Sequence, residues 1–514
     1  MTPLLAPLGG SPIGSAPTRT GIAPLPDGVQ GADVASFYHL PKTGVTGKSC
    51  RGLACWVARS LNPAGWAAAE QQDLRIHCLG NCFAAPARAD STARPHMQVV
   101  APQAIVLPRL VSGGARRLST SRELGGYEAW RRARQLAPER VLEIMEASGL
   151  RGRGGAGFPV GRKWRAAAAQ PAGEKYLIAN ADEGDPGAYI DRFLLEEDPH
   201  AIIEGLLIGA HAIGATLGWI YVRSEYPAAH AILLEALQEA RAAGWLGPDA
   251  LGVDRPFDLA VHQGGGSYVC GEETALIRSL EGRRPEVLAR PPYITESGLW
   301  RRPTVVNNVE TLVNVPWIVT HGSDAYHAMG HAQSRGTKVV SLNSLFRRPG
   351  LYEVEFGVSV RHIVEELGGG LRTDLPIKGV FIGGPLAGII PPHLFDTRLD
   401  FEELRAIGAG VGHGGVVAFD EQTSIRALLQ HVFSFAAYES CGKCTPCRRG
   451  SRLLAESFAA RLREQPDGTL SAADVDALIA VLKWTSLCGL GTGLAEFAES
   501  AFRHFGKELN PCPP

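Results

Sequence analysis

Two groups of cysteines have the spacing of metal-cluster ligands. Toward the C-terminus, Cys441, Cys444 and Cys447 form a C-x2-C-x2-C run, and Cys488 follows much later in the chain. A [4Fe–4S] cluster requires four thiolates that converge on one point, and cysteines on a tight turn can each bind a different iron. A structural four-cysteine zinc site is the alternative, but its ligands more often come as two separated C-x2-C pairs. The pattern therefore favours an iron–sulfur cluster.

The other group lies near the N-terminus and consists of two pairs. Cys50 and Cys55 form C-x4-C, and Cys78 and Cys82 form C-x3-C. Two paired knuckles suit a [2Fe–2S] cluster, which takes two sulfurs per iron. Zinc fits the same number of ligands. The spacing favours the cluster and leaves zinc open.

A glycine-rich loop has the composition of a phosphate-binding turn. Gly152, Gly154 and Gly157 match the G-x-G-x-x-G dinucleotide pattern, but a predicted helix precedes them and no clear helix opens from the third glycine. The loop is therefore not a Rossmann fingerprint. Its glycines would still let the backbone approach a phosphate closely, and Arg153 and Lys163 can supply positive charge.

Polar side chains follow apolar, strand-like segments at three further places. They belong to the segments Asn180–Glu183, Gly264–Thr274 and Val306–Thr311. A ligand crevice commonly opens at the carboxyl ends of parallel strands. Together these segments supply amides, carboxylates and backbone donors, which predicts a nucleotide site beside a metal cluster.

The elements that would position these residues indicate an α/β multidomain protein. The 514 residues correspond to about three domains. Strand-like and helical segments alternate from about residue 151 to 335, a strand-rich segment follows, and the last part is wholly helical. We expect a flexible tail (1–35), a cysteine-bearing domain (36–110), an α/β nucleotide-binding domain (111–335), a small β-grasp-like α+β domain (336–420) and a four-helix bundle with the Fe–S cluster (421–514).

Composition and targeting signals exclude several classes of protein. The 51 basic residues balance 52 acidic ones, so no basic excess exists to neutralise nucleic-acid phosphates. The apolar stretch Gly205–Val222 is predicted to be a buried helix that leads into a buried strand, and not a transmembrane segment. The N-terminus is interrupted by proline and glycine, unlike a signal peptide. Together with the clustered thiols, this predicts a soluble cytoplasmic protein.

Five motifs resemble those found, in this order, in the family of NADH-oxidising flavoprotein subunits. They are GLRGRGGAGFPVGRKW, NADEGDPG, GSYVCGEETALIRSLEGRRP, PTVVNNVETL and ESCGKCTPCRRG. The family includes the NADH-binding subunit of complex I and the diaphorase subunits of NAD-reducing hydrogenases and NAD-dependent formate dehydrogenases. The resemblance covers about Pro138 to Leu509. The N-terminal cysteine segment resembles the thioredoxin-like [2Fe–2S] domain fused to the soluble diaphorases.

The resemblance implies FMN and NAD(H) as cofactors and a role for each motif residue. FMN would be held by Gly152, Arg153, Gly154, Gly155, Lys163, Asn180, Asp182, Tyr268, Glu272, Asn307 and Asn308. NADH would be bound by Phe158 and Glu273, with Glu183 near the nicotinamide, and Glu183 and Tyr268 are the catalytic candidates. Asp185, Arg290 and Tyr293 stand where the family often has Glu, Lys and Phe, and they preserve charge or aromaticity.

The arrangement of the whole chain resembles most the beta subunit of NAD-dependent formate dehydrogenases. This implies two partners: a molybdenum- or tungsten-containing alpha subunit with Fe–S clusters, and a small thioredoxin-like [2Fe–2S] gamma subunit. The expected activity is hydride exchange between NAD(H) and FMN, with single electrons relayed through the [4Fe–4S] cluster. The alternatives are the diaphorase subunit of an NAD-reducing hydrogenase and the NADH-binding subunit of a complex I-like quinone oxidoreductase. A relay protein without flavin and a zinc-binding module remain as further alternatives.

Overall fold

A four-stranded parallel sheet forms the centre of the larger half of the molecule. The computed structural model describes residues 45, 47–72, 74–171, 173–465 and 468–509. The strands lie in the order β4-β3-β2-β5 and all run the same way. Their bounds are β2 (Tyr176–Ala181), β3 (Leu217–Val222), β4 (Asp258–Gln263) and β5 (Thr304–Asn308). The tail expected at residues 1–35 lies outside the described residues.

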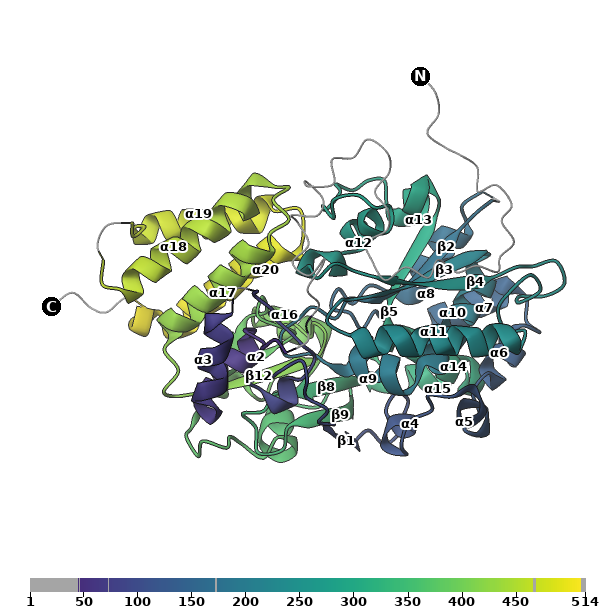
Figure 1. Ribbon diagram of the computed structural model, residues 1–514, viewed down its shortest axis with the longest axis horizontal. Coiled ribbons are helices and arrows are strands. Elements are labelled where there is room, and N and C mark those ends of the chain that lie inside the picture. The colour runs from purple at the N-terminus through teal and green to yellow at the C-terminus, as the bar shows by residue number, and fades with distance from the viewer. Residues whose placement is uncertain (1–44, 46, 73, 172, 466–467, 510–514) are drawn as a thin grey trace, which may run out of the picture.

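Helices surround this sheet (Figure 1). They are α4 (Pro108–Val111), α5 (Leu118–Glu123), α6 (Glu128–Ala133), α7 (Pro138–Ser148), α8 (Val160–Ala168), α9 (Ile190–Glu197), α10 (Pro199–Ile213), α11 (Pro227–Ala242), α12 (Glu273–Leu280), α13 (Ile294–Ser297), α14 (Val309–His321) and α15 (Ser323–His327). Every residue of α10 is buried. All faces of α10 therefore lie in the core, and α10 leads into β3, so the prediction of a buried helix followed by a buried strand is confirmed.

A second sheet has six strands and mixed directions. Its order is β1-β9-β8-β12-β10-β11. The strands are β1 (His96–Val99), β8 (Thr337–Leu342), β9 (Gly350–Glu355), β10 (Ile377–Ile382), β11 (Ile389–Ile390) and β12 (Gly415–Asp420), accompanied by α16 (Phe401–Ala406); the short pair β6 (Gly330–His331) and β7 (Ser334–Arg335) precedes β8. The expected boundary is wrong at one point, because β1 pairs in parallel with β9 and thus joins this sheet from before residue 110.

The N-terminal cysteine segment is smaller than expected. It contains the helices α2 (Leu53–Val57) and α3 (Pro63–Gln71). Among the described residues before β1, β pairing is limited to isolated bridges such as Cys50 with Ile76, so a thioredoxin-like sheet is not formed there. The segment is instead stabilised by contacts with the rest of the chain. Trp56 stacks on His431 with ring centroids 5.1 Å apart, and Ser344 donates its backbone N–H to the Cys82 carbonyl at 2.9 Å.

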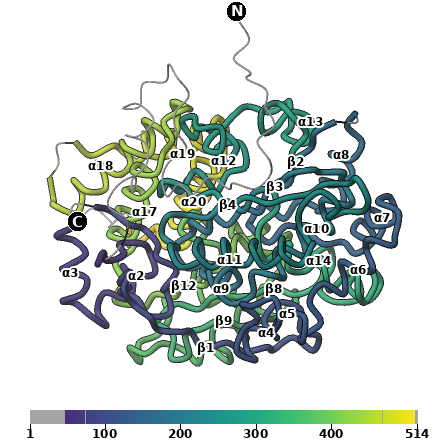
Figure 2. The backbone as a smooth tube through the Cα atoms, turned by 45° about the vertical axis from the view of Figure 1, so that its right-hand side comes forward, coloured from purple at the N-terminus to yellow at the C-terminus, as the bar shows by residue number. Residues whose placement is uncertain are grey.

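The C-terminal part is the expected helical bundle. Within the described residues it consists of α17 (Ile425–Glu439), α18 (Ser451–Leu462), α19 (Ala472–Thr485) and α20 (Gly489–Leu509). Figures 1 and 2 both show α17 beside the N-terminal helices, with α18 and α19 farther out. Ser424 and Ser471 cap α17 and α19 by accepting backbone N–H groups. Among the described helices, none has both the length and the apolar character needed to cross a bilayer.

Candidate functional site

The polar residues predicted from the strand ends do converge at one edge of the parallel sheet. Asn180 and Asn308 are register partners at the carboxyl ends of β2 and β5. The Asn180 amide donates to the Gly271 carbonyl at 2.9 Å, which joins β2 to the turn that follows β4. The Asn307 side-chain oxygen accepts the Trp164 indole N–H at 2.9 Å. The carboxyl edge is therefore lined with amides whose orientation is fixed.

The glycine-rich loop closes over this edge. Gly152 donates its N–H to the Phe158 carbonyl at 3.0 Å, which makes residues 152–158 a closed loop. A Cβ on Gly154 would lie 2.9 Å from the Cβ of Asn308, so only glycine allows the loop to pack this closely. A helix, α7, precedes the loop as predicted. The expectation that no helix follows it is wrong, because α8 begins at Val160.

The structure gives the Arg153 side chain a different role from the predicted flavin contact. Its guanidinium donates to the Tyr326 hydroxyl at 2.8 Å and to the Arg335 carbonyl at 2.6 Å, and it lies 4.7 Å from the centre of the Phe356 ring. The side chain is fully buried. Arg153 thus anchors the glycine-rich loop to the region around β7 and β9.

A second cluster joins residues predicted to bind FMN with residues predicted to bind NAD(H). Lys163 Nζ lies 3.2 Å from Glu273 Oε2, and Arg290 bridges Glu272 at 2.6 Å and Glu273 at 3.0 Å. Glu272 also caps α12 by accepting backbone N–H groups. Phe158 lies near the Lys163 ammonium, 6.0 Å from ring centre to nitrogen, and is 52% exposed. Tyr293 is 55% exposed. An exposed aromatic ring can stack on a base, and the carboxylates beside it can accept hydrogen bonds from ribose hydroxyls.

Two carboxyl groups of the NADEGDPG motif, those of Asp182 and Glu183, are buried between these clusters, and that of Asp185 is half-buried. Asp182 Oδ2 has no hydrogen-bond partner among the described residues, and burial raises the pKa of Asp182 well above its usual range. Burial also raises the pKa of Glu183 to about 8. Asp185 accepts a 2.6 Å hydrogen bond from the Tyr268 hydroxyl. An unpartnered buried carboxyl calls for a donor, and the ribityl hydroxyls of FMN would supply one.

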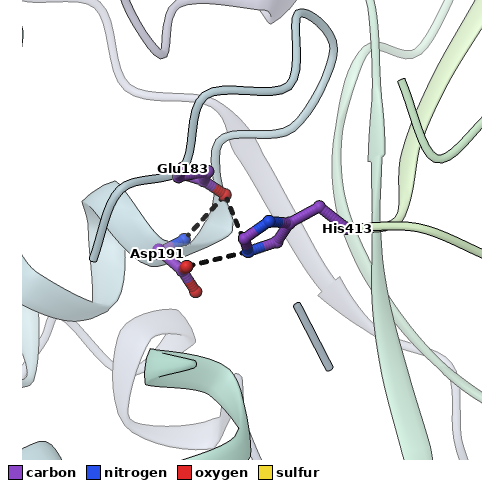
Figure 3. A group of neighbouring side chains, drawn as sticks. All are labelled: Glu183, Asp191 and His413. Atoms are coloured by element: carbon purple, nitrogen blue, oxygen red, sulfur yellow. Dashed lines mark hydrogen bonds and ion pairs between the residues drawn. The ribbon is translucent and has the colours of Figure 1, made fainter. Parts of the chain in front are cut away.

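Two further residues of the site have no counterpart in the sequence prediction. His413 and Asp191 lie with Glu183 in one buried group, in which His413 Nε2 is 2.8 Å from Asp191 Oδ2 and 4.0 Å from Glu183 Oε1 (Figure 3). His413 comes from the six-stranded-sheet region and Asp191 from the first turn of α9. No local spacing joins residues so far apart in the chain, so only the tertiary fold shows this group.

The four C-terminal cysteines lie close to one another. Cys441, Cys444 and Cys447 lie on the turn after α17 and on the helical turn that follows, and Cys488 lies between α19 and α20. Burial, together with the neighbouring cysteines, raises the pKa of Cys447 to about 12 and that of Cys488 to about 11. Such a group of thiols is stabilised once metal ions bind them as thiolates. Cys441 and Cys488 pack against Val269, next to Tyr268, so the thiols adjoin the crevice.

The N-terminal cysteines also converge, and all four are buried. Cys78 Sγ lies 3.8 Å from Cys82 Sγ. Backbone N–H groups point at three of the sulfurs: Gly52 at Cys50 (3.3 Å), Gly80 at Cys78 (3.4 Å) and Ala87 at Cys55 (3.3 Å). The hydrogen bond between Cys78 and Cys82 lowers the pKa of Cys78 to about 6 and raises that of Cys82. Hydrogen bonds donated to sulfur help to set the reduction potential of an iron–sulfur cluster.

The N-terminal cysteines adjoin the carboxyl edge of the sheet. The Arg223 guanidinium donates to the Cys78 carbonyl at 3.1 Å and also to the Glu183 carbonyl. A small cavity is bounded by Cys78, Asp182 and Tyr268, among others. The crevice therefore has one group of thiols on each of two sides.

Comparisons with known proteins agree with this arrangement. Residues 145–317 match the family model of the Nuo51 FMN-binding domain, and residues 427–511 match the NADH-ubiquinone oxidoreductase-F iron–sulfur binding region. HndC, a subunit of the NADP-reducing hydrogenase of Solidesulfovibrio fructosivorans, is 42% identical over 75% of this chain and 78% of its own length. The F 2 polypeptide of the NADH-quinone oxidoreductase of Rhizobium meliloti is 41% identical, over 76% and 93%.

A solved structure extends the likeness to nearly the whole chain. A chain in the crystal structure of an NAD+-reducing [NiFe]-hydrogenase in the H2-reduced state superposes with a TM-score of 0.77 at 29% identity, over 93% of this chain and 86% of that one. A relative above 40% identity over three quarters of the chain and two family models matched in sequence order together establish the family. The chain belongs to the family of NADH-binding flavoprotein subunits of complex I type, with an FMN-binding domain and a [4Fe–4S]-binding region.

Proposed function

We propose that this chain is the diaphorase subunit of a hydrogenase-type complex, in which it exchanges hydride between NAD(H) and FMN and passes single electrons to the cluster on Cys441, Cys444, Cys447 and Cys488. FMN, when bound, supplies the conversion between two-electron and one-electron chemistry. The observation that carries the proposal is the turn from Tyr268 to Glu272. Its Tyr268 hydroxyl lies in the carboxylate crevice, while the adjacent Val269 belongs to the hydrophobic cluster that includes Cys441 and contacts Cys488.

Different residues of the crevice would bind FMN and NADH. The closed glycine loop and Asn308 would hold the flavin, and Tyr268 and Asp185, joined by a short hydrogen bond, would form a wall beside the reacting rings. Phe158 and Glu273, the latter paired with Lys163, would take the adenosine half of NADH at the more exposed end. Hydride transfer needs no general base, so these residues orient the two rings and exclude water.

Glu273 gives a test of the NAD(H) end. We propose that its carboxylate faces the ribose hydroxyls and repels the 2′-phosphate of NADPH, because like charges placed together cost several kcal/mol. In Glu273→Gln the preference for NADH over NADPH, measured as the ratio of kcat/KM values, should fall about tenfold or more. Glu296→Gln, at a carboxylate that caps α13, is the matched control. An unchanged preference in Glu273→Gln would refute the assignment.

We also propose that Cys50, Cys55, Cys78 and Cys82 hold a [2Fe–2S] cluster. Their convergence, their burial and the three backbone N–H groups that point at sulfur support iron over zinc. Metal analysis of the purified chain should give about six irons per flavin, four from one cluster and two from the other. About four irons and one zinc would show that the N-terminal group is a zinc site.

We further propose that the partner of this chain is a hydrogenase. The hydrogenase chain that superposes on 93% of this chain, and HndC among the relatives, favour a hydrogenase partner over the formate dehydrogenase first expected from the domain arrangement. Purification of the native complex would decide. Nickel in the partner supports the proposal, whereas molybdenum or tungsten, with a small [2Fe–2S] gamma subunit, would replace it with a formate dehydrogenase. A membrane-bound quinone reductase would indicate the complex I-like alternative.

A further inference from the structure

A turn from the six-stranded-sheet region enters the flavin domain and carries His413 (Figure 3). His413 precedes β12, is flanked by Gly412 and Gly414, and is only 6% exposed. Its Nε2–H donates to Asp191 Oδ2 at 2.8 Å. Glu183 caps the same end of α9 by accepting the backbone N–H groups of Asp191 and Arg192. His413 therefore contacts the acidic first turn of α9 in the protein interior.

The Asp191 oxygen that accepts the hydrogen bond from His413 also accepts one from a second residue. The Asn308 amide donates to Asp191 Oδ2 at 2.6 Å, and its nitrogen lies 3.0 Å from His413 Nε2. The side-chain oxygen of Asn308 accepts the Thr311 N–H at 3.2 Å and so caps α14. Both ends of the Asn308 amide are thus fixed, one by the helix and one by the pair that Asp191 forms with His413.

The backbone just before His413 also contacts the glycine-rich loop. Gly412 and Gly155 form an isolated β-bridge. A Cβ on Gly154 would meet Asn308, and a Cβ on Gly384, in the neighbouring turn of the same region, would lie 2.9 Å from Asp185 Cγ. The six-stranded-sheet region therefore reaches the flavin crevice at three points: the loop, Asn308 and Asp185.

The charges that face His413 favour a protonated ring. Burial alone would lower the pKa of His413, but the carboxylates of Asp191 and Glu183 outweigh it and raise the pKa to about 9. The Lys338 ammonium opposes this effect and is itself paired with Glu310 on α14. Asp182 and Asp185 also lie within the electrostatic reach of His413. The raised pKa of His413 thus favours an imidazolium that is hydrogen-bonded to Asp191.

A metal ion is the alternative occupant of this group. Ligand atoms of Glu183, Asp191 and His413 lie within 4.8 Å of one another. However, the Glu183 oxygens already accept two backbone N–H groups and the Tyr226 hydroxyl, and Asp191 Oδ2 accepts from His413 and Asn308. The hydrogen bonds and the ion pair account for all these oxygens except Asp191 Oδ1, so we favour the ion pair.

We infer that His413 is a positioning residue for the flavin: by holding Asp191, it orients Asn308 and keeps the six-stranded-sheet region closed against the glycine-rich loop, so that FMN affinity depends on this buried pair. The inference rests on the proposed function in one respect, namely that FMN binds at the glycine-rich loop and Asn308. It predicts that FMN binding can be weakened from a residue outside the flavin motifs.

The test measures FMN binding to the deflavinated full chain by fluorescence titration between pH 6.5 and 9.5. His413→Gln should weaken FMN binding about tenfold at pH 7, since it removes a charge-assisted hydrogen bond to Asp191. In the unmodified protein the affinity should fall as the pH rises through about 9, because the raised pKa of His413 means that its contribution is present at low pH and is lost on deprotonation. Glu183 titrates in both proteins, so the difference between the two profiles reports His413.

Lys338→Gln is the matched control. Lys338 forms another buried ion pair between the same two regions, with Glu310, but makes no hydrogen bond to Asn308 or Asp191 among the described residues. It should lower the melting temperature without weakening FMN binding beyond about twofold. If Lys338→Gln and His413→Gln weaken FMN binding equally, the specific role of His413 is overturned.

Other outcomes separate this inference from the proposed function. If His413→Gln does not fold, the pH profile of the unmodified protein still tests the inference, and a flat profile up to pH 9.5 overturns it. A stoichiometric cation other than iron, present in the unmodified protein and absent from His413→Gln, would overturn it in favour of a metal site. If the unmodified chain binds no FMN at all, the proposed function fails. If it binds FMN and His413→Gln binds equally well, only the role of His413 fails.

Discussion

The two cysteine groups differ most in their exposure to solvent. In the N-terminal group all four thiols are buried, and three sulfurs accept backbone N–H groups. In the C-terminal group Cys441 and Cys447 are buried, but Cys444 and Cys488 are half-buried. There the Ser440 hydroxyl lies 3.3 Å from Cys447 Sγ, and Arg284 donates to the Cys441 carbonyl at 3.2 Å. One site is enclosed, and the other reaches the surface.

This difference separates two tasks. Hydrogen bonds to sulfur, net charge and solvent exposure set the reduction potential of an iron–sulfur cluster. A cluster that reaches the surface can exchange electrons with a partner subunit, while its buried side meets Val269 and the crevice. The N-terminal group is enclosed, and Arg223 links it to the crevice by donating hydrogen bonds to the carbonyls of Cys78 and Glu183. We therefore expect the C-terminal cluster to be the exit to the partner.

The largest effect should come from Cys488→Ser. This change removes the ligand that closes the C-terminal site, so the chain should lose about four irons and the low-potential EPR signal while it keeps FMN. Electron transfer to the partner should be abolished, whereas reduction of FMN by NADH should continue. Loss of the flavin with the iron retained would contradict the separation of the two sites.

Cys78→Ser should act on the other group alone. It should remove about two irons and leave the C-terminal EPR signal and electron transfer to the partner within about twofold of the unmodified protein. The measurement is iron content together with EPR of the NADH-reduced protein. If partner reduction is lost in Cys78→Ser as completely as in Cys488→Ser, the N-terminal group lies on the obligatory route, and the division of tasks is wrong.

Removal of metal by a chelator should distinguish the sites by rate. Because Cys444 and Cys488 are half-buried and the N-terminal thiols are buried, the C-terminal cluster should lose iron first under oxygen-free conditions. Mössbauer spectra recorded during the treatment would show the order. Equal rates would mean that exposure of the ligands does not control metal loss in this protein.

The smallest effect should come from Arg284→Gln. The Arg284 side chain is 43% exposed and lies beside Cys441, so loss of its charge should make the C-terminal cluster about 10–40 mV more negative. The N-terminal cluster should keep its potential within the error of a spectroelectrochemical titration. A shift of both clusters would show that the two are not electrostatically separate.

The sequence was sufficient to predict those features that depend on local spacing. The structure brings Cys441, Cys444, Cys447 and Cys488 together beside the C-terminal helices and places amides at the carboxyl ends of β2 and β5. These features follow from spacing and from strand ends, which are local properties. The roles predicted for individual flavin and NAD(H) residues stay predictions.

Other features could not be predicted because they depend on tertiary contacts. Arg153 stands among glycines like a phosphate ligand, yet its guanidinium is bound by Tyr326 and Arg335, which are distant in sequence. His413 reaches Asp191 only through the packing of two separate sheets. The thioredoxin-like sheet expected before residue 110 is not formed among the described residues, because β1 pairs with β9 instead. In each case a long-range partner decides the outcome.

The central claim is that a bound flavin lies between the glycine-rich loop and the carboxylates, within electron-transfer reach of iron on the C-terminal cysteines. An oxygen-free titration of the purified holoprotein with NADH, followed by flavin absorbance and by EPR, tests it most directly. We predict that NADH bleaches the flavin band and that a [4Fe–4S] signal develops during the same titration. A protein that carries its full iron but shows no flavin band, or gives no EPR signal on addition of NADH, would contradict the account.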